Sequence, residues 1–234
     1  MSADLPLVDL SHVDTWLFDL DNTLYPASSG FMEQFSERMT QYVERLTSLP
    51  RDEAFKLQKR YLAEYGLTLG GLIAHHGIEP KAFHEQFHDL SLETLAHDPA
   101  LLAALQRLPG RRLIFTNADG VHAARVLERL ELSHLFEGVF HIGSADYVGK
   151  PDPGAFAKLS AAHAIDPSQT AFFEDSERNL APAADIGMTT VLVGPHAEAS
   201  TAAFVDYKTD NLAQFLRRAQ LSEAARCPPK TSAT

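Results

Sequence analysis

Short, continuously apolar runs recur along the chain, and each ends in polar or small residues. Runs of this kind, rich in β-branched and aromatic side chains, are typical of strands that are buried on both faces of a sheet. The pattern occurs in residues 15–18, 113–115, 139–142, 171–173 and 190–193. We therefore expect these segments to form the strands of a parallel sheet.

Patterns of amphipathic helices lie between the later strands. Residues 121–130 carry apolar side chains at a spacing of three, and Pro153 precedes a helical pattern over 155–163, where a proline often begins a helix. A further helical pattern over 180–187 ends at a glycine, as many helices do. Strands that alternate with helices predict an α/β fold with a doubly wound parallel sheet.

The segment of residues 26–98 has a different pattern. Apolar side chains at helical spacing predict three helices in it, and no stretch resembles a buried strand. We therefore predict an all-helical insert between the first and second strands. The predicted units are a core made of residues 1–25 and 99–221, the helical insert of residues 26–98, and a disordered tail of residues 222–234.

Composition and charge narrow the range of partners. The 234 residues suffice for one core domain with an inserted subdomain, and the formal net charge of -11 argues against nucleic acid or an anionic membrane as a partner. No stretch approaches the roughly 18 apolar residues of a membrane span, and the N-terminus lacks the pattern of a signal peptide. Cys227 is the single cysteine, so an intramolecular disulfide is excluded. We expect a cytoplasmic protein with no evident obligate protein partner.

Polar residues follow three of the predicted strands at the point where each strand ends. In open parallel sheets, ligands bind beyond the carboxyl ends of the strands. Three segments far apart in the sequence therefore direct reactive groups into one crevice. These groups are Asp19 and Asp21 after the first strand, Thr116 and Asn117 after the second, and Glu174 and Asp175 after the fourth.

Four motifs, in this order, resemble those of the haloacid dehalogenase-like hydrolase superfamily. They are residues 19–24 (DLDNTL), 116–117 (TN), 149–151 (GKP) and 174–179 (EDSERN). The resemblance implies a Rossmann-like core in which the helical insert is a type-1 cap. It also implies an enzyme that hydrolyses phosphate esters of small metabolites.

The resemblance assigns chemistry to the two aspartates of the first motif. Asp19 is the nucleophile, because a carboxylate can attack phosphorus and divide hydrolysis into two easier steps through an acyl phosphate. Asp21 suits a general acid that protonates the leaving oxygen and then a base that activates water. Since two carboxylates lie close together, we expect the pKa of one of them to be raised, which favours Asp21 as the acid.

The resemblance also implies a cofactor and a phosphate site. The cofactor is Mg²⁺, which prefers carboxylate oxygens and offsets the repulsion between phosphate and nucleophile. Its ligands would be Asp19, the backbone carbonyl of Asp21, and Asp175. Glu174 would act through a water molecule or support these ligands without contacting the ion. The phosphoryl oxygens would be bound by Thr116, Asn117, Lys150 and the backbone N–H groups near Leu20 and Asp21.

Further segments resemble the yeast-type pyrimidine 5′-nucleotidase subfamily, among them residues 21–25 (DNTLY), 65–67 (YGL), 76–78 (HGI) and 122–127 (HAARVL). This resemblance implies hydrolysis of UMP or CMP to nucleoside and phosphate. Tyr65 and His76 could then face the nucleoside, although packing within the insert and a local hydrogen bond explain them at least as well. We expect His84 and His88 to lie on a solvated helix face, and Arg125 to form a surface ion pair.

Four other interpretations stay open. A phosphatase of another small metabolite, such as phosphoglycolate or a sugar phosphate, would need the same residues. A sugar-phosphate mutase would differ only in the group that accepts the phosphoryl. A haloacid dehalogenase shares the nucleophile but needs neither an acid at Asp21 nor magnesium. A binding protein on an inactive scaffold is disfavoured, because no catalytic position is substituted.

Overall fold

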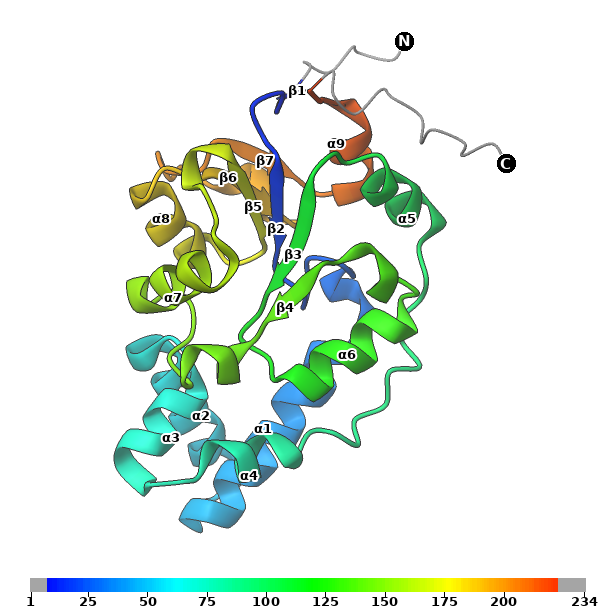
Figure 1. The fold of residues 1–234 in the computed structure, drawn as a ribbon. Coiled ribbons are helices and arrows are strands. Elements are labelled where there is room, and N and C mark those ends of the chain that lie inside the picture. The colour runs from blue at the N-terminus through cyan, green and yellow to red at the C-terminus, as the bar shows by residue number, and fades with distance from the viewer. Residues whose placement is uncertain (1–7, 223–234) are drawn as a thin grey trace, which may run out of the picture.

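A six-stranded parallel sheet lies at the centre of the computed structural model, which describes residues 8–222 (Figure 1). The order of the strands is β4-β3-β2-β5-β6-β7. Their bounds are β2 Thr15–Phe18, β3 Arg111–Phe115, β4 Gly138–Phe140, β5 Thr170–Glu174, β6 Thr189–Val193 and β7 Tyr207–Thr209. Separately, β1 (Val8–Asp9) pairs with β8 (Ala219–Gln220). Residues 223–234 of the expected tail lie outside the described residues, as does Cys227.

The central strands are buried on both faces, as their continuous apolar runs predict. Every residue of β2 and of β5 is buried. Because successive side chains of a strand point to opposite faces, Phe18 and Phe173 stack on one side of the sheet, with ring centroids 4.7 Å apart. Leu17 and Phe172 belong to the hydrophobic cluster on the other side. The strand over 139–142 was predicted too long, since β4 ends at Phe140 and a 3₁₀ helix follows.

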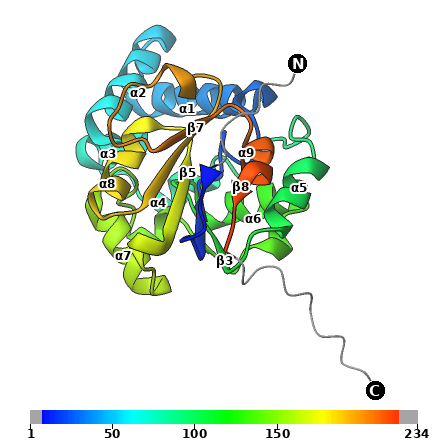
Figure 2. The same cartoon turned by 90° about the horizontal axis from the view of Figure 1, so that it is seen from above.

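Helices cover both faces of the sheet, as Figure 2 shows from above. On one face lie α5 (Pro99–Gln106), α6 (Gly120–Arg129) and α9 (Leu212–Arg218), and on the other lie α7 (Pro153–His163) and α8 (Glu177–Asp185). Aspartate side chains cap the N-termini of α5, α6 and α7, and α5 and α7 have proline in the first turn. This arrangement confirms the predicted α/β fold with a doubly wound parallel sheet.

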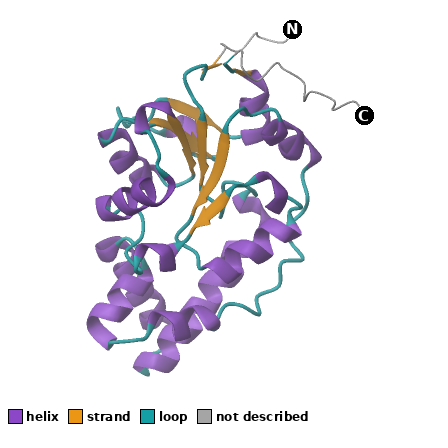
Figure 3. Cartoon of the chain, viewed as in Figure 1, coloured by secondary structure: helices purple, strands orange, loops and turns teal. Residues whose placement is uncertain are grey.

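Between β2 and α5 the chain forms four α-helices that lie together beyond one end of the sheet (Figure 3). They are α1 (Phe31–Thr47), α2 (Arg51–Tyr65), α3 (Thr68–His76) and α4 (Pro80–Glu85), preceded by a 3₁₀ helix at Ala27–Ser29. The prediction of three helices was wrong, because Gly70 and Gly71 weaken the helical signal of α3. Gly71 is needed there for packing, since a Cβ on it would lie 2.2 Å from the ring of Tyr61. No helix among residues 8–222 has the length and apolar character needed to cross a membrane.

Candidate active site

The ends of three adjacent strands bring the polar residues of the first, second and fourth motifs together. Strand β2 lies between β3 and β5, so Asp19 emerges between Thr116 and Glu174. The ladder continues past the strand ends: the N–H of Asp19 donates to the Phe173 carbonyl over 2.9 Å, and the N–H of Thr116 donates to the Phe140 carbonyl over 3.0 Å. The backbone at each of these positions is therefore held by the sheet.

Lys150 lies at the centre of this group although it is distant from the others in the sequence. Its side chain is 1% exposed, and its Nζ donates to Asp19 Oδ1 over 2.6 Å, to Glu174 Oε2 over 2.6 Å and to the Phe115 carbonyl over 2.7 Å. An ammonium group has three donors, so all are used. Burial alone would lower the pKa of Lys150, but the two carboxylates outweigh it and raise the pKa.

Asn117 fixes the backbone of Lys150 through both ends of its amide. Its Oδ1 accepts from the N–H of Lys150 over 2.8 Å, and its Nδ2 donates to the carbonyl of Lys150 over 2.9 Å. Only glycine fits at position 149, because a Cβ there would lie 2.4 Å from Asn117 Oδ1. The side chain of Asn117 is thus committed to Lys150, and the phosphate contact that we predicted for it would have to come from its backbone N–H.

Thr116 is oriented by a short turn. It is 2% exposed, and its Oγ1 accepts from the N–H of Ala118 over 3.0 Å. The hydroxyl hydrogen of Thr116 has no acceptor among the residues of the described range, so it can donate to a ligand.

Three carboxylates form an acidic cluster around one ammonium group. Asp19, Glu174 and Asp175 each offer an oxygen, and these oxygens all lie within 4.8 Å of one another. Burial, reinforced by the charge of neighbouring carboxylates, raises the pKa of Asp19 to about 8, that of Glu174 to about 7 and that of Asp175 to about 6. Because Lys150 neutralises only one of the three, the cluster favours a further cation, and its hard oxygen donors fit Mg²⁺.

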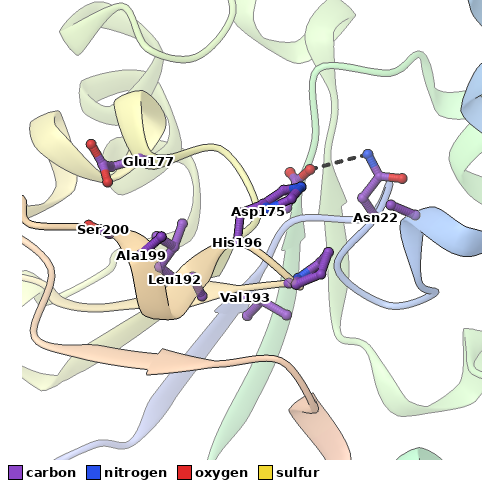
Figure 4. A pocket seen from close by; sticks show the side chains of 12 residues that line it. Asn22, Asp175, Glu177, Leu192, Val193, His196, Ala199 and Ser200 are labelled. Carbon is purple, nitrogen blue, oxygen red and sulfur yellow. Dashed lines mark hydrogen bonds between the residues drawn. The ribbon is translucent and has the colours of Figure 1, made fainter.

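Both carboxylate oxygens of Glu174 accept hydrogen bonds, which leaves Glu174 less accessible to a ligand than Asp175. Its two oxygens accept from Lys150 Nζ and, over 3.1 Å, from the N–H of Ser176. Asp175 is reached from a cavity of about 390 Å³ whose lining includes Asn22, Glu177 and His196. Figure 4 shows this cavity and the 3.2 Å hydrogen bond from Asn22 Nδ2 to Asp175 Oδ2. Asp175 is therefore the more accessible of the two acids.

The environment of Asp21 differs from that of Asp19. Asp21 Oδ1 accepts from the hydroxyl of Tyr25 over 2.6 Å and lies 2.9 Å from His122 Nε2. Burial would raise the pKa of Asp21, but the charge and hydrogen bond of His122, joined by Tyr25, lower it. One of the two aspartates of the first motif does have a raised pKa, as expected, but it is Asp19 and not Asp21, the residue expected to act as the acid.

A second cavity, of about 330 Å³, lies between the helices of residues 31–85 and the core, beside Asp21. Phe35, Phe83 and Phe87 give it an aromatic lining, and Asn117 and His122 add polar groups. Tyr65 and His76 are not among its lining residues. Instead, Tyr65 Oη lies 2.7 Å from His75 Nε2, and His76 Nε2 lies 3.0 Å from Tyr61 Oη.

Two histidines of the helical segment contact the N-terminus of α6, so the predicted solvated face was wrong. His88 Nε2 lies 2.7 Å and His84 Nδ1 3.4 Å from Asp119 Oδ2. The predicted surface ion pair of Arg125 was also wrong, because this residue donates to the carbonyls of His88 and Leu90. For the contact of His84 and His88 with Asp119, the i, i+4 spacing of the histidines was the only sequence signal. Their partner Asp119 is the N-cap of α6 and could not be identified from that spacing.

Comparison with known proteins places this geometry in a family. Residues 13–187 match the family model of haloacid dehalogenase-like hydrolases, which is well over half of the chain. The chain belongs to this family. Its motifs, its parallel sheet and its cluster of polar strand ends are thus those of a haloacid dehalogenase-like hydrolase.

Two curated relatives of this haloacid dehalogenase-like chain have names that refer to phosphate chemistry. The chain is 28% identical over 193 residues to phosphate metabolism protein 8 of Saccharomyces cerevisiae, covering 76% of this chain but only 60% of the yeast protein. It is 26% identical over 194 residues to glyceraldehyde 3-phosphate phosphatase of Methanopyrus kandleri, covering 76% of this chain and 82% of that relative.

Solved structures share the fold at lower identity. A phosphatase of the same superfamily from Thermococcus onnurineus has a TM-score of 0.61 at 17% identity, covering 88% of this chain and 97% of that one. A 2-haloacid dehalogenase from Pseudomonas syringae has a TM-score of 0.55 at 20% identity, with 88% and 97% coverage. Because both chemistries occur on this fold, the fold alone does not separate them.

Proposed function

We propose that this haloacid dehalogenase-like hydrolase is a magnesium-dependent phosphatase that forms a phospho-aspartate on Asp19 and acts on a pyrimidine nucleoside monophosphate. The observation that carries the proposal is the buried Lys150, which binds Asp19 and Glu174 at the meeting point of β2, β3 and β5. It supplies the local positive charge that an anionic substrate needs in a protein with a net charge of -11.

The attack on phosphorus uses the free oxygen of Asp19. Lys150 binds Oδ1, so Oδ2 is available to form the bond to phosphorus. The Thr116 hydroxyl and the backbone N–H groups near Leu20 and Asp21 bind the phosphoryl oxygens, and Lys150 adds charge beside them. Mg²⁺ would be held by Asp19, Asp175 and the backbone carbonyl of Asp21. Glu174 would not contact the ion directly but would accept the hydrogen bond that holds Lys150 in place. The bound ion offsets the repulsion between phosphate and nucleophile.

Proton transfer is the task of Asp21. It donates a proton to the leaving oxygen as the phosphorus–oxygen bond breaks, and later takes a proton from the water that attacks the phospho-aspartate. Its pKa is lowered in the absence of substrate. A phosphate dianion beside it raises that pKa, because a like charge disfavours the ionised carboxylate.

The aromatic cavity beside Asp21 supports a substrate with a ring. Its volume of about 330 Å³ falls at the lower end of the range for small-molecule sites, and Phe35, Phe83 and Phe87 can pack against a flat base. We propose that residues 26–98 act as a cap that excludes water from this cavity. A three-carbon phosphate is the second candidate, since the Methanopyrus relative is named a glyceraldehyde 3-phosphate phosphatase.

Release of inorganic phosphate from a substrate panel tests the proposal. The panel contains UMP, CMP, phosphoglycolate, glyceraldehyde 3-phosphate and sugar phosphates, each with Mg²⁺, and the Asp19→Asn variant is the blank. We expect the highest kcat/KM for the pyrimidine nucleotides, loss of turnover in EDTA and its return with Mg²⁺. Substantial turnover by Asp19→Asn would refute the covalent mechanism, and full activity in EDTA would refute the metal. A preference for glyceraldehyde 3-phosphate would replace the proposed substrate.

A further inference from the structure

The carboxylate of Asp21 is held at one oxygen by two different residues. Within residues 8–222, the side-chain hydrogen bonds of Asp21 both fall on Oδ1: Tyr25 donates over 2.6 Å, and His122 Nε2 lies at 2.9 Å. Oδ2 is left without a side-chain partner in that range. Asp21 lines the aromatic cavity, where its side chain is 21% exposed, so a ligand in the cavity can reach the free oxygen.

The two partners of Asp21 come from different parts of the core. Tyr25 lies four residues further along the loop after β2, whereas His122 lies in the first turn of α6 and is 101 residues away. The backbone N–H of His122 donates to the N-cap Asp119 over 2.8 Å, which fixes this turn. His122 is 7% exposed and Tyr25 is 3% exposed. Neither ring can therefore move without disturbing packed neighbours.

Phe31, the first residue of α1, packs against both rings. Its ring lies over His122 with centroids 5.4 Å apart and planes 23° apart, and it meets the Tyr25 ring edge-on at 6.1 Å and 87°. Phe31 is fully buried. Figure 1 shows α1 continuing away from this point into the group of helices beyond the sheet. The groups that hold Asp21 are thus in contact with the start of the helical segment.

We propose that His122 and Tyr25 are positioning residues that turn Oδ2 of Asp21 toward the leaving group, and that Phe31 keeps both rings in place. The inference rests on the function proposed above. In the step concerned, the bond between Asp19 and phosphorus forms, the bond between phosphorus and the leaving oxygen breaks, and the proton of Asp21 Oδ2 moves to that oxygen. Without its two anchors the carboxylate can rotate, and a small misplacement of a reacting group costs up to about 10²-fold in rate.

The dependence of the rate on the leaving group distinguishes positioning from packing. The p-nitrophenolate anion leaves without a proton, whereas an alkoxide needs one. We expect His122→Ala to lower kcat/KM for the best alkyl phosphate of the panel by about 10- to 100-fold more than for p-nitrophenyl phosphate. Because kcat/KM covers only the steps up to departure of the leaving group, slow hydrolysis of the phospho-aspartate does not affect this ratio.

Three further variants, at His122, Tyr25 and Phe31, keep the test independent of folding defects. His122→Gln keeps an N–H donor near the position of Nε2 and should recover part of the alkyl-phosphate activity. Tyr25→Phe, which removes only a hydroxyl, and Phe31→Leu, which removes only the ring, should show the same selective loss at a few-fold each. His97→Ala is the matched control, because His97 is also hydrogen-bonded, to the Leu130 carbonyl over 3.0 Å, and contacts neither Asp21 nor the cavity.

Equal losses on both substrates in the His122 and Tyr25 variants would overturn the inference and leave these residues a packing role. A selective loss in His97→Ala would overturn it as well. If the unmodified protein hydrolyses neither ester, the proposed function itself fails, which is a different result from an unchanged ratio.

Discussion

Replacing Lys150 by methionine removes the ammonium group that contacts Asp19 and Glu174 in the acidic cluster, while keeping the side chain close in size. The variant leaves the carboxylates of Asp19 and Glu174 without their 2.6 Å partner, and it leaves the Phe115 carbonyl without a donor. The lysine side chain is 1% exposed, so water cannot take its place without opening the site. We therefore expect a large loss of stability as well as of activity.

The size of this loss follows from the burial of the pair. Removing one partner of a buried ion pair costs about 3–5 kcal/mol, because the remaining charge is buried without compensation. For a chain of this length each kcal/mol shifts Tm by about 2–4 °C, so Lys150→Met should melt roughly 6–20 °C lower. Lys158→Met is the matched control: Lys158 bonds Asp146 at 2.8 Å, but the two side chains are 42% and 82% exposed. Such exposed pairs contribute about 0–1 kcal/mol.

Thermal unfolding gives Tm and urea unfolding gives the free energy of unfolding; both are followed by circular dichroism for the two variants, with EDTA present so that no metal compensates. The double variant Lys150→Met/Glu174→Gln should recover part of the loss, because one buried carboxylate fewer is left unpaired. The reasoning is refuted if Lys150→Met is no less stable than Lys158→Met, or if the double variant is less stable than the single one.

The remaining predictions concern the metal and pH. Mg²⁺ at about 100 times its Kd should raise the free energy of unfolding by about 2.7 kcal/mol. A thermal melt should show the corresponding rise in Tm for the unmodified protein and for an Asp210→Asn control, but not for Asp175→Asn. A rise in Tm that Asp175→Asn retains would contradict the assignment of Asp175 as a ligand. Burial lowers the pKa of His84, so the folded state favours its neutral form. As the pH falls, this histidine is protonated first in the unfolded chain. The stability that neutral His84 contributes is therefore lost as the pH falls below about 6.5 and through the folded pKa. Urea midpoints at about pH 7.5 and 5.5 should therefore differ less in His84→Asn than in the unmodified protein, and equal differences would count against this assignment.

Local pattern was enough to predict the sheet and the residues at its edge. Strands buried on both faces must be continuously apolar, so β2, β3, β5 and β6 could be read directly from the sequence. The carboxyl ends of parallel strands meet at one edge, so the sequence alone predicts that Asp19, Thr116 and Glu174 converge. The helix α3 could not be read in this way, because its glycines are explained only by packing against Tyr61.

The partners of each charged group were decided by the tertiary structure. Asp21 differs from Asp19 because it meets His122, which lies 101 residues away, whereas Asp19 meets Lys150, 131 residues away. Burial and distance between such segments set the pKa values, so the sequence could predict that one carboxylate would be perturbed but not which one. The chain by itself therefore determined which chemical groups reach the edge of the sheet. Their protonation and orientation depend on contacts that exist only once distant segments are packed together.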